Sequence, residues 1–337
     1  MRILLLIAIV FLGPAIGASG QSEAQRQGNH YIDLSRQLGG KGETVKARES
    51  VQRAIAIFSA AKLYTDLGFA YWELSGLYGL AADQSATKIG YIQQAVGAWH
   101  QAGNVKKEAD GLKELGDARQ VNGDFAQAFS ELKQALTLYQ SINEPDLRRI
   151  YDLMGDVSTS LGNLNDAVRY GLLAAQAAEK LKDSSLQLCA IFNHLGISYY
   201  YLKDFPAAAT YYAKALALAE KNTSTPDIYF ISYNYGNILK RMGRYDECNR
   251  HLSRILKEYP GVDTSTRVLY TASFLASYTS LKEFDSAGKY FDQLTQLAKG
   301  RHFNNETQRT VYLNSIIYLL GSGRYDEARG FLKTAEA

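Results

Sequence analysis

The amino-acid sequence predicts an all-α fold, a solenoid of about seven helix pairs, and three recurring features point to it. A glycine returns about every 40 residues, a small residue follows it 12 positions later, and a turn signal lies between them. The glycines are Gly76, Gly116, Gly155, Gly196 and Gly236, and the small residues are Ala128, Ala167, Ala208, Cys248, Ala287 and Ala328.

The two small positions of each unit predict two antiparallel helices that cross closely. If the glycine lies in the first helix and the small residue in the second, the missing side-chain bulk lets the helices approach each other. Between them stand glycine turns, as in Gly123, Gly162, Gly243 and Gly323, where glycine suits the left-handed end of a helix. The first helix of each unit is therefore expected to end there.

A large apolar residue two positions after the turn predicts the start of each second helix. These residues are Phe125, Leu164, Phe205, Tyr245, Phe284 and Tyr325. Apolar residues then recur at three and four positions, which is helical spacing. Pro260 is expected to stop the helix that begins at Tyr245.

The unit Phe192, Leu195, Gly196, Tyr199, Ala208, Tyr212 and Ala215 resembles the tetratricopeptide repeat. The resemblance implies a right-handed superhelical solenoid whose first helices line a concave groove. It covers residues 69–337, in units near 69–108, 109–147, 148–188, 189–228, 229–267, 268–308 and an incomplete 309–337. A lead segment is expected at 21–42 and a degenerate helix pair at 43–68. The later units carry Leu275 and Ile316 in place of the glycine.

The first twenty residues predict a secretory signal peptide, because Arg2 precedes an apolar run that ends in small residues. Cleavage after Gly17 or after Gly20 would fit, and an uncleaved anchor is the alternative. We therefore expect an exported chain, periplasmic or at the cell surface, with no membrane span after cleavage.

Composition favours a folded domain and argues against nucleic acid as a partner. The formal net charge is only +3, and the basic residues are scattered among acidic ones. The only two cysteines, Cys189 and Cys248, fall in different units and are expected to be buried, free residues.

No motif typical of catalysis stands in the sequence, so we expect neither an enzyme nor a cofactor. Cys248 and His251 have a spacing that suits metal ligands, but Cys248 holds the small packing position. No metal site is therefore predicted. His194 is expected to face the groove or to pack against the neighbouring unit.

Tyrosine is in excess, with 24 residues, and most of it suits half-buried seams between stacked helices. The resemblance to the tetratricopeptide repeat implies that the rest contributes to a candidate binding groove for a protein or peptide partner. Its residues are Asn193, Tyr200, Tyr201, Tyr233, Asn237, Lys240 and Arg241. Amides, phenols and two cations suit hydrogen bonds to an extended peptide and to carboxylates, whereas an ordinary solvated groove is the alternative.

The carboxylate-clamp pattern of the family is not reproduced. Only Asn237 stands at a suitable place, whereas Asp117 and Asp156 hold the equivalent places in earlier units and would repel a carboxylate. In the repeat frame the last helix is expected to be cut short, which predicts an uncapped end and allows self-association there. Two functions remain open: the sensor half of a bacterial signalling protein, with a histidine kinase or a transcriptional output, and a free-standing scaffold.

Overall fold

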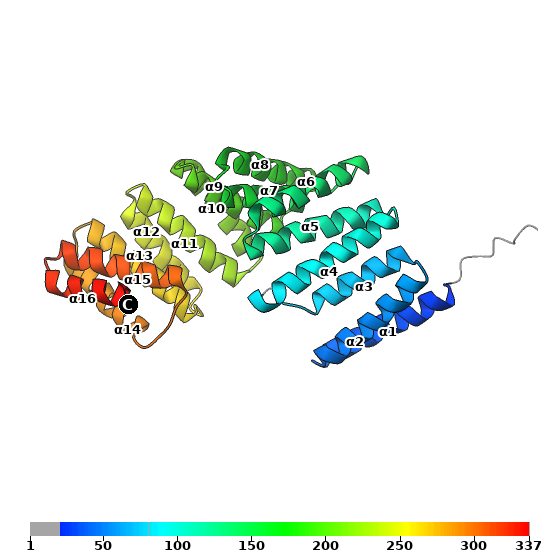
Figure 1. Ribbon diagram of the computed structural model, residues 1–337. Coiled ribbons are helices and arrows are strands. Elements are labelled where there is room, and N and C mark those ends of the chain that lie inside the picture. The colour runs from blue at the N-terminus through cyan, green and yellow to red at the C-terminus, as the bar shows by residue number, and fades with distance from the viewer. Residues whose placement is uncertain (1–20, 80, 337) are drawn as a thin grey trace, which may run out of the picture. The chain divides into compact units, whose positions relative to one another are not determined.

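A computed structural model describes residues 21–79 and 81–336 of the chain, and every regular element in them is an α-helix (Figure 1). The predicted signal peptide lies outside these residues. The sixteen helices of the described part are α1 Glu23–Gly40, α2 Thr44–Ala60, α3 Tyr64–Gly76, α4 Ala82–Gln101, α5 Val105–Asn122, α6 Phe125–Ser141, α7 Arg148–Ser160, α8 Leu164–Lys180, α9 Leu186–Tyr201, α10 Phe205–Lys221, α11 Thr225–Arg241, α12 Tyr245–Glu258, α13 Thr264–Ser280, α14 Phe284–Ala298, α15 Asn305–Gly321 and α16 Tyr325–Glu336. The all-α prediction is confirmed.

The chain divides into two compact units, residues 1–122 and 123–337. We call odd-numbered helices first helices and even-numbered helices second helices. Every large apolar residue predicted to begin a second helix from α6 onward is the first residue of that helix. No helix among the described residues is long and apolar enough to cross a membrane.

The predicted turn glycines take the left-handed backbone conformation. Gly162, between α7 and α8, has a φ of 77° and donates from its amide to the Thr159 carbonyl oxygen at 3.0 Å. The next amide, of Asn163, donates to the Ser158 carbonyl oxygen at 2.9 Å, so two carbonyls in the last turn of the helix are satisfied. Lys203 and Lys282 hold the corresponding turn positions with φ of 63° and 61°.

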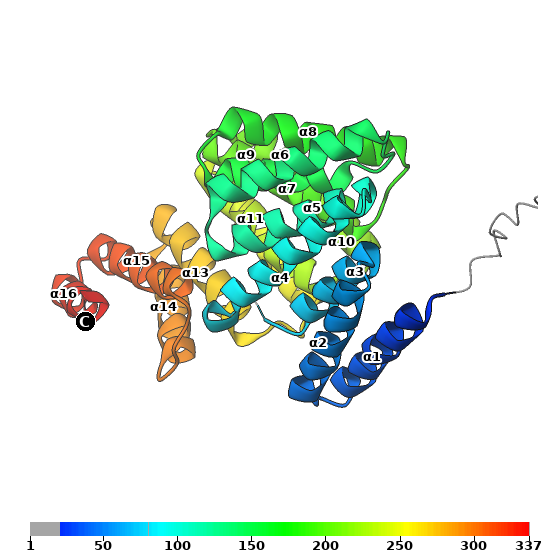
Figure 2. The same ribbon diagram turned by 45° about the vertical axis from the view of Figure 1, so that its right-hand side comes forward.

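In unit 1, α1, α2 and α3 lie side by side (Figure 2). Residues 23–60 form a full helix pair, where the sequence had suggested a lead segment at 21–42 and a degenerate pair at 43–68. The helix begins early because Ser22 and Gln25 form a capping box. The Phe58 ring of α2 packs on Gly28 of α1. Gly28 therefore serves as the close-packing glycine of this pair, although it does not follow the 40-residue period.

Gly76 does not play the packing role that the 40-residue period predicted. It is the last residue of α3, and a side chain there would meet open space. Gly68, two turns earlier, lies under the Trp99 indole. A Cβ added to Gly68 would lie 2.4 Å from the Trp99 Nε1 atom. That prediction was wrong because the ring, rather than a small residue, fills the gap between α3 and α4.

In unit 2, the close helix crossings follow the sequence. A Cβ on Gly155 would lie 3.2 Å from the Ala167 carbonyl oxygen, and one on Gly236 would lie 3.3 Å from the Cys248 sulfur. At Gly196 the neighbour is instead the Tyr212 ring, one turn beyond Ala208. The small pair therefore brings α7 against α8 and α11 against α12, as expected.

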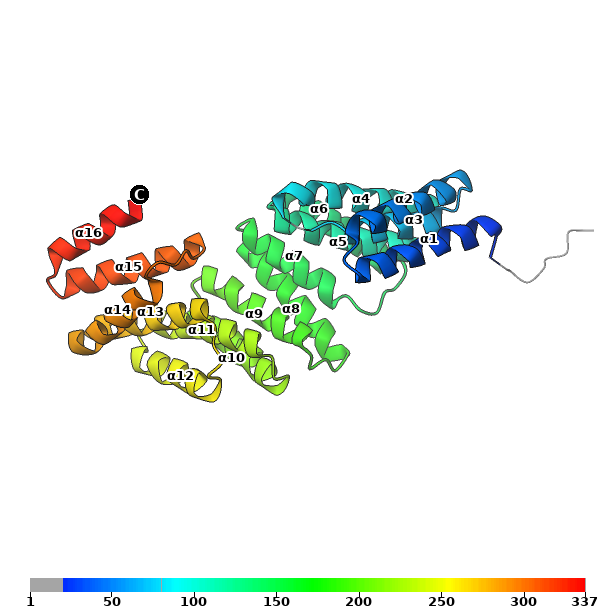
Figure 3. The same cartoon turned by 90° about the horizontal axis from the view of Figure 1, so that it is seen from below.

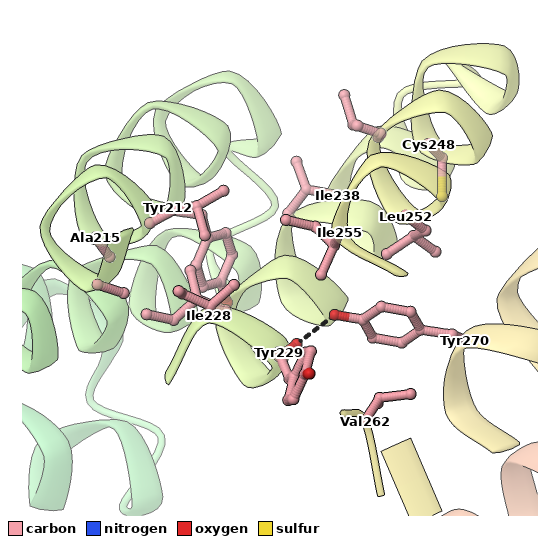
Figure 4. Packing of buried hydrophobic residues seen from close by; sticks show 14 of the residues in the cluster. Tyr212, Ala215, Ile228, Tyr229, Ile238, Cys248, Leu252, Ile255, Val262 and Tyr270 are labelled. Carbon is pink, nitrogen blue, oxygen red and sulfur yellow. Dashed lines mark hydrogen bonds between the residues drawn. The ribbon is translucent and has the colours of Figure 1, made fainter. Parts of the chain in front are cut away.

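Buried tyrosines join successive repeats of unit 2 (Figure 4). The Tyr270 hydroxyl, from α13, donates to the Tyr229 carbonyl oxygen of α11 at 2.9 Å, and the Tyr229 hydroxyl donates to the Tyr259 carbonyl oxygen at 2.7 Å. Both cysteines are free and buried, as predicted. These phenols satisfy buried carbonyls while their rings fill the seam, which explains part of the tyrosine excess.

Candidate partner-binding surface

In unit 2, α7 lies against α9, and α13 lies against both α11 and α15 (Figure 3). Polar side chains on α7, α9 and α11 link one first helix to the next. The four links are Asp152 to His194 at 2.7 Å, Thr159 to Ser198 at 3.1 Å, Asn234 to Asn193 at 3.4 Å and Arg241 to Tyr200 at 3.3 Å. We call the set formed by these residues together with Tyr201, Tyr233, Asn237 and Lys240 the first-helix surface.

Asn193 and Tyr200 serve mainly as links within this surface. Asn193 is buried, and its amide oxygen accepts a hydrogen bond from the Asn234 amide. The half-buried Tyr200 ring meets Tyr201 edge to face at 5.4 Å between centroids. Tyr201 itself is 56% exposed and is the most accessible of the predicted aromatic residues.

Tyr233 and Asn237 lie where α11 approaches α15. The Tyr233 phenol interacts with Asn237 and with Thr310 of α15, and burial raises the pKa of Tyr233. Their polar groups are thus partly used inside unit 2.

Lys240 and Arg241 carry the positive charge of the surface. The half-buried Lys240 amine donates to the Ser273 hydroxyl of α13 at 3.1 Å, and burial lowers the pKa of Lys240 to about 8. Arg241 is exposed and donates to the Tyr200 hydroxyl. The two neighbours in sequence therefore reach toward α13 and α9.

Asp152 is a residue of the first-helix surface that the sequence analysis did not single out. Its buried carboxylate contacts the His194 ring and accepts from Arg149 at 3.3 Å. Burial alone would lower the pKa of His194, but Asp152 and then Asp156 raise it to about 9. The 42-residue separation of Asp152 and His194, close to one repeat, was the available signal.

His194 therefore packs against the neighbouring repeat, one of its two predicted positions, with 28% of its side chain exposed.

Cys248 and His251 have different neighbours, since the Cys248 sulfur lies against Gly236. The His251 ring packs on Tyr235 at 5.1 Å between centroids, and burial lowers the pKa of His251 to about 4. No group of three His, Cys, Asp or Glu side chains in the described residues is placed to hold a metal ion.

Two other surface features lie apart from these residues. In unit 1 a hollow of about 280 Å³ between α3, α4 and α5 is lined by Trp72, Lys88, Glu114 and Asp117 among others. On α15, Leu313, Ile317 and Leu320 form an exposed apolar stripe at helical spacing.

Family models of the tetratricopeptide repeat match residues 147–221 and 232–261. Human G-protein-signaling modulator 1 is 36% identical over 101 residues, which are 29% of this chain and 14% of that protein. The chain thus spans only a small part of this relative. The residues that the two family models match include the first-helix surface.

Among solved structures, aspartyl phosphate phosphatase F from Bacillus subtilis is similar with a TM-score of 0.60, 13% identity and 96% of each chain covered. A Rap protein in complex with competence and sporulation factor has a TM-score of 0.57 and 14% identity over 93% of this chain and 96% of that one. A signal-transduction ATPase from Pyrococcus horikoshii with a tetratricopeptide repeat sensor reaches 0.62 at 14% identity, over 91% of this chain and 45% of that one. At these identities the likeness shows the fold alone.

Proposed function

We propose that this chain, a tetratricopeptide repeat protein, holds an extended segment of a protein partner on the first-helix surface of unit 2. The four side-chain links between α7, α9 and α11 carry the proposal. They hold polar groups of three repeats in fixed positions, so that little side-chain entropy is lost when a ligand binds.

The chemistry of the accessible groups favours a peptide. Tyr201 offers a rigid, exposed ring with a hydroxyl, and Arg241, which contacts the neighbouring Tyr200, offers several hydrogen-bond donors. Aromatic and arginine side chains of this kind supply much of the affinity in protein interfaces. We propose a binding role and no catalytic one.

We also propose that binding serves signalling, with the chain as an exported sensor module. The support is the signal-peptide pattern of residues 1–20, together with the fold shared with a Rap protein bound to a peptide factor and with a repeat sensor of a signalling ATPase. A scaffold that assembles other proteins would use the same surface. Fusing residues 1–40 to alkaline phosphatase tests export, because the enzyme becomes active only outside the cytoplasm, and an inactive fusion would overturn this part.

Selection from a displayed peptide library tests the binding role. We expect the purified chain to enrich related sequences, and the Tyr201→Ala, Arg241→Ala double variant to bind them at least about tenfold more weakly. Arg254→Ala is the matched control, because this arginine lies on the second helix α12 and pairs with Glu220 and Glu258. Equal binding by the double variant and by the control would remove the first-helix surface from the proposal.

A further inference from the structure

We propose that Lys240, Arg241 and Ser273 form a carboxylate-binding site on the first-helix surface. The site takes an acidic group of the partner, and in that respect it rests on the proposed function. The carboxylate would lie between the ammonium of Lys240 and the guanidinium of Arg241. The Ser273 hydroxyl, from the next first helix, would hold the ammonium in place.

The strongest observation is a half-buried cation that lacks a counter-ion. Across the described residues, no carboxylate oxygen lies within ion-pair distance of Lys240 or Arg241, whose polar partners are the hydroxyls of Ser273 and Tyr200. By contrast, Lys46, on an exposed part of α2, has the Glu43 carboxylate at 2.6 Å. A charge removed from water costs free energy unless an opposite charge compensates it. The missing anion is therefore expected to come from a ligand.

Three neighbouring first helices position the two cations. Ser273 on α13 contacts the Lys240 amine from one side. On the other side, Tyr200 of α9 accepts from Arg241, and the Arg241 guanidinium carbon lies 6.0 Å from the centre of the Tyr200 ring. Because each contact comes from a different repeat, the site exists only in the stacked solenoid.

The donor set suits a carboxylate better than a phosphate. A carboxylate presents two oxygens, one for the ammonium and one for the guanidinium. A phosphate would bring a third oxygen, and that oxygen would need a further donor. The depressed pKa of Lys240, about 8, is consistent with a missing anion and leaves the amine mostly protonated at neutral pH.

A direct test follows the Lys240 amine by NMR in the full chain labelled with carbon-13 at lysine Cε, using Lys240→Arg to assign the signal. We expect its titration midpoint to rise by at least about half a unit in sodium acetate compared with sodium chloride at equal ionic strength. Sodium phosphate serves as the competing anion. An equal midpoint in acetate and chloride, or a larger rise in phosphate, would overturn the carboxylate site.

A second arm distinguishes a partner's side chain from a free carboxylate. Peptides selected by the chain are compared with versions in which every Glu and Asp is replaced by Gln and Asn. We expect the replacement, or the Lys240→Met variant, to weaken binding about tenfold, whereas Lys214→Met, an exposed lysine on α10, has no effect. Unchanged affinity for the amide peptides would show that the site does not bind an acidic side chain of the partner.

The two proposals fail separately. If peptides bind through Tyr201 but neither acetate nor the amide replacement has an effect, the carboxylate site is wrong and the peptide surface stands. If acetate shifts the midpoint while no peptide binds, the anion site stands, the proposed function is wrong, and the ligand is a free carboxylate.

Discussion

His194 and Asp152 are 42 residues apart, and the His194 Nδ1 atom lies 2.7 Å from the Asp152 carboxylate. This contact joins α9 to α7 and places a positive charge over a carboxylate that is almost fully buried. Arg149 supplies a second positive charge to the same carboxylate. A buried carboxylate with two cationic partners is a strong link between repeats, because removing either partner leaves charge uncompensated.

The pKa of His194 tests this link. Because Asp152 raises it from the ordinary 6.5 to about 9, the pair contributes fully to folding stability below pH 6.5 and loses that contribution as pH rises through 9. We expect His194→Gln to lower the free energy of unfolding at pH 6 and to have little effect above pH 9.5. Urea unfolding at both pH values measures the difference, and Asp152→Asn should bring the NMR titration midpoint of His194 below 7. A pH-independent effect of His194→Gln would contradict the ion pair.

Glycine packing in α3 gives a matched pair of substitutions. Gly68→Ala should destabilise unit 1 by about 1–3 kcal/mol, because the new Cβ would collide with the Trp99 ring. Gly76→Ala, in the same helix, should be neutral or stabilise by up to about 1 kcal/mol, since its surroundings are open. Thermal unfolding of both variants checks the contrast, and equal shifts in Tm would mean that Trp99 does not lie on Gly68.

The hydrogen bond from Tyr270 to the Tyr229 carbonyl predicts a local loss of stability. Tyr270→Phe keeps the ring but removes the hydroxyl that donates to the Tyr229 carbonyl oxygen, so we expect a loss of about 1 kcal/mol. Tyr325→Phe is the control, because Tyr325 is 64% exposed. Denaturant unfolding compares the two, and a Tyr270→Phe protein as stable as the control would argue against the link between α11 and α13.

Lys240 is predicted to oppose folding at neutral pH. Since burial lowers its pKa from 10.5 to about 8, folding disfavours the charged amine, and the cost fades as pH rises from 8 toward 10.5. Other groups near the amine are Arg241 and the Cys248 thiol, whose own pKa burial raises. Lys240→Met should therefore raise the free energy of unfolding at pH 7 by on the order of 1–3 kcal/mol.

That gain should be much smaller at pH 10.5, where the unfolded lysine is also losing its proton. Lys214→Met provides the reference, as an exposed lysine whose loss should produce no such pH dependence. If Lys240→Met destabilises the protein at pH 7, the amine gains more from Ser273 than it loses by burial.

Local rules in the sequence predicted the elements of unit 2 well. The starts of the second helices, from Phe125 in α6 to Tyr325 in α16, could be predicted because a turn followed by helical spacing is a local signal. Gly155 and Gly236 could be predicted to mark close crossings because the partner helix is adjacent in sequence. The pair α1–α2 was harder, since the Phe58 ring fills the place of a small residue.

The candidate site depended on contacts between repeats, which local patterns do not encode. Asn193 was predicted to line a groove, yet its side chain is buried and bonded to Asn234, 41 residues away. Tyr233 meets Thr310, which belongs to a repeat two units later. Such contacts are set by small rotations between stacked repeats, and only the folded arrangement reveals them.

Photo-crosslinking from chosen positions most directly tests whether a peptide lies on the first-helix surface. A photoreactive phenylalanine derivative replaces Tyr201 in one protein and Leu172, which is exposed on α8, in another. Each protein is mixed with a library-selected peptide and irradiated. We predict that the peptide is joined to position 201 and not to position 172. Crosslinking at 172 with none at 201 would contradict binding on the first-helix surface.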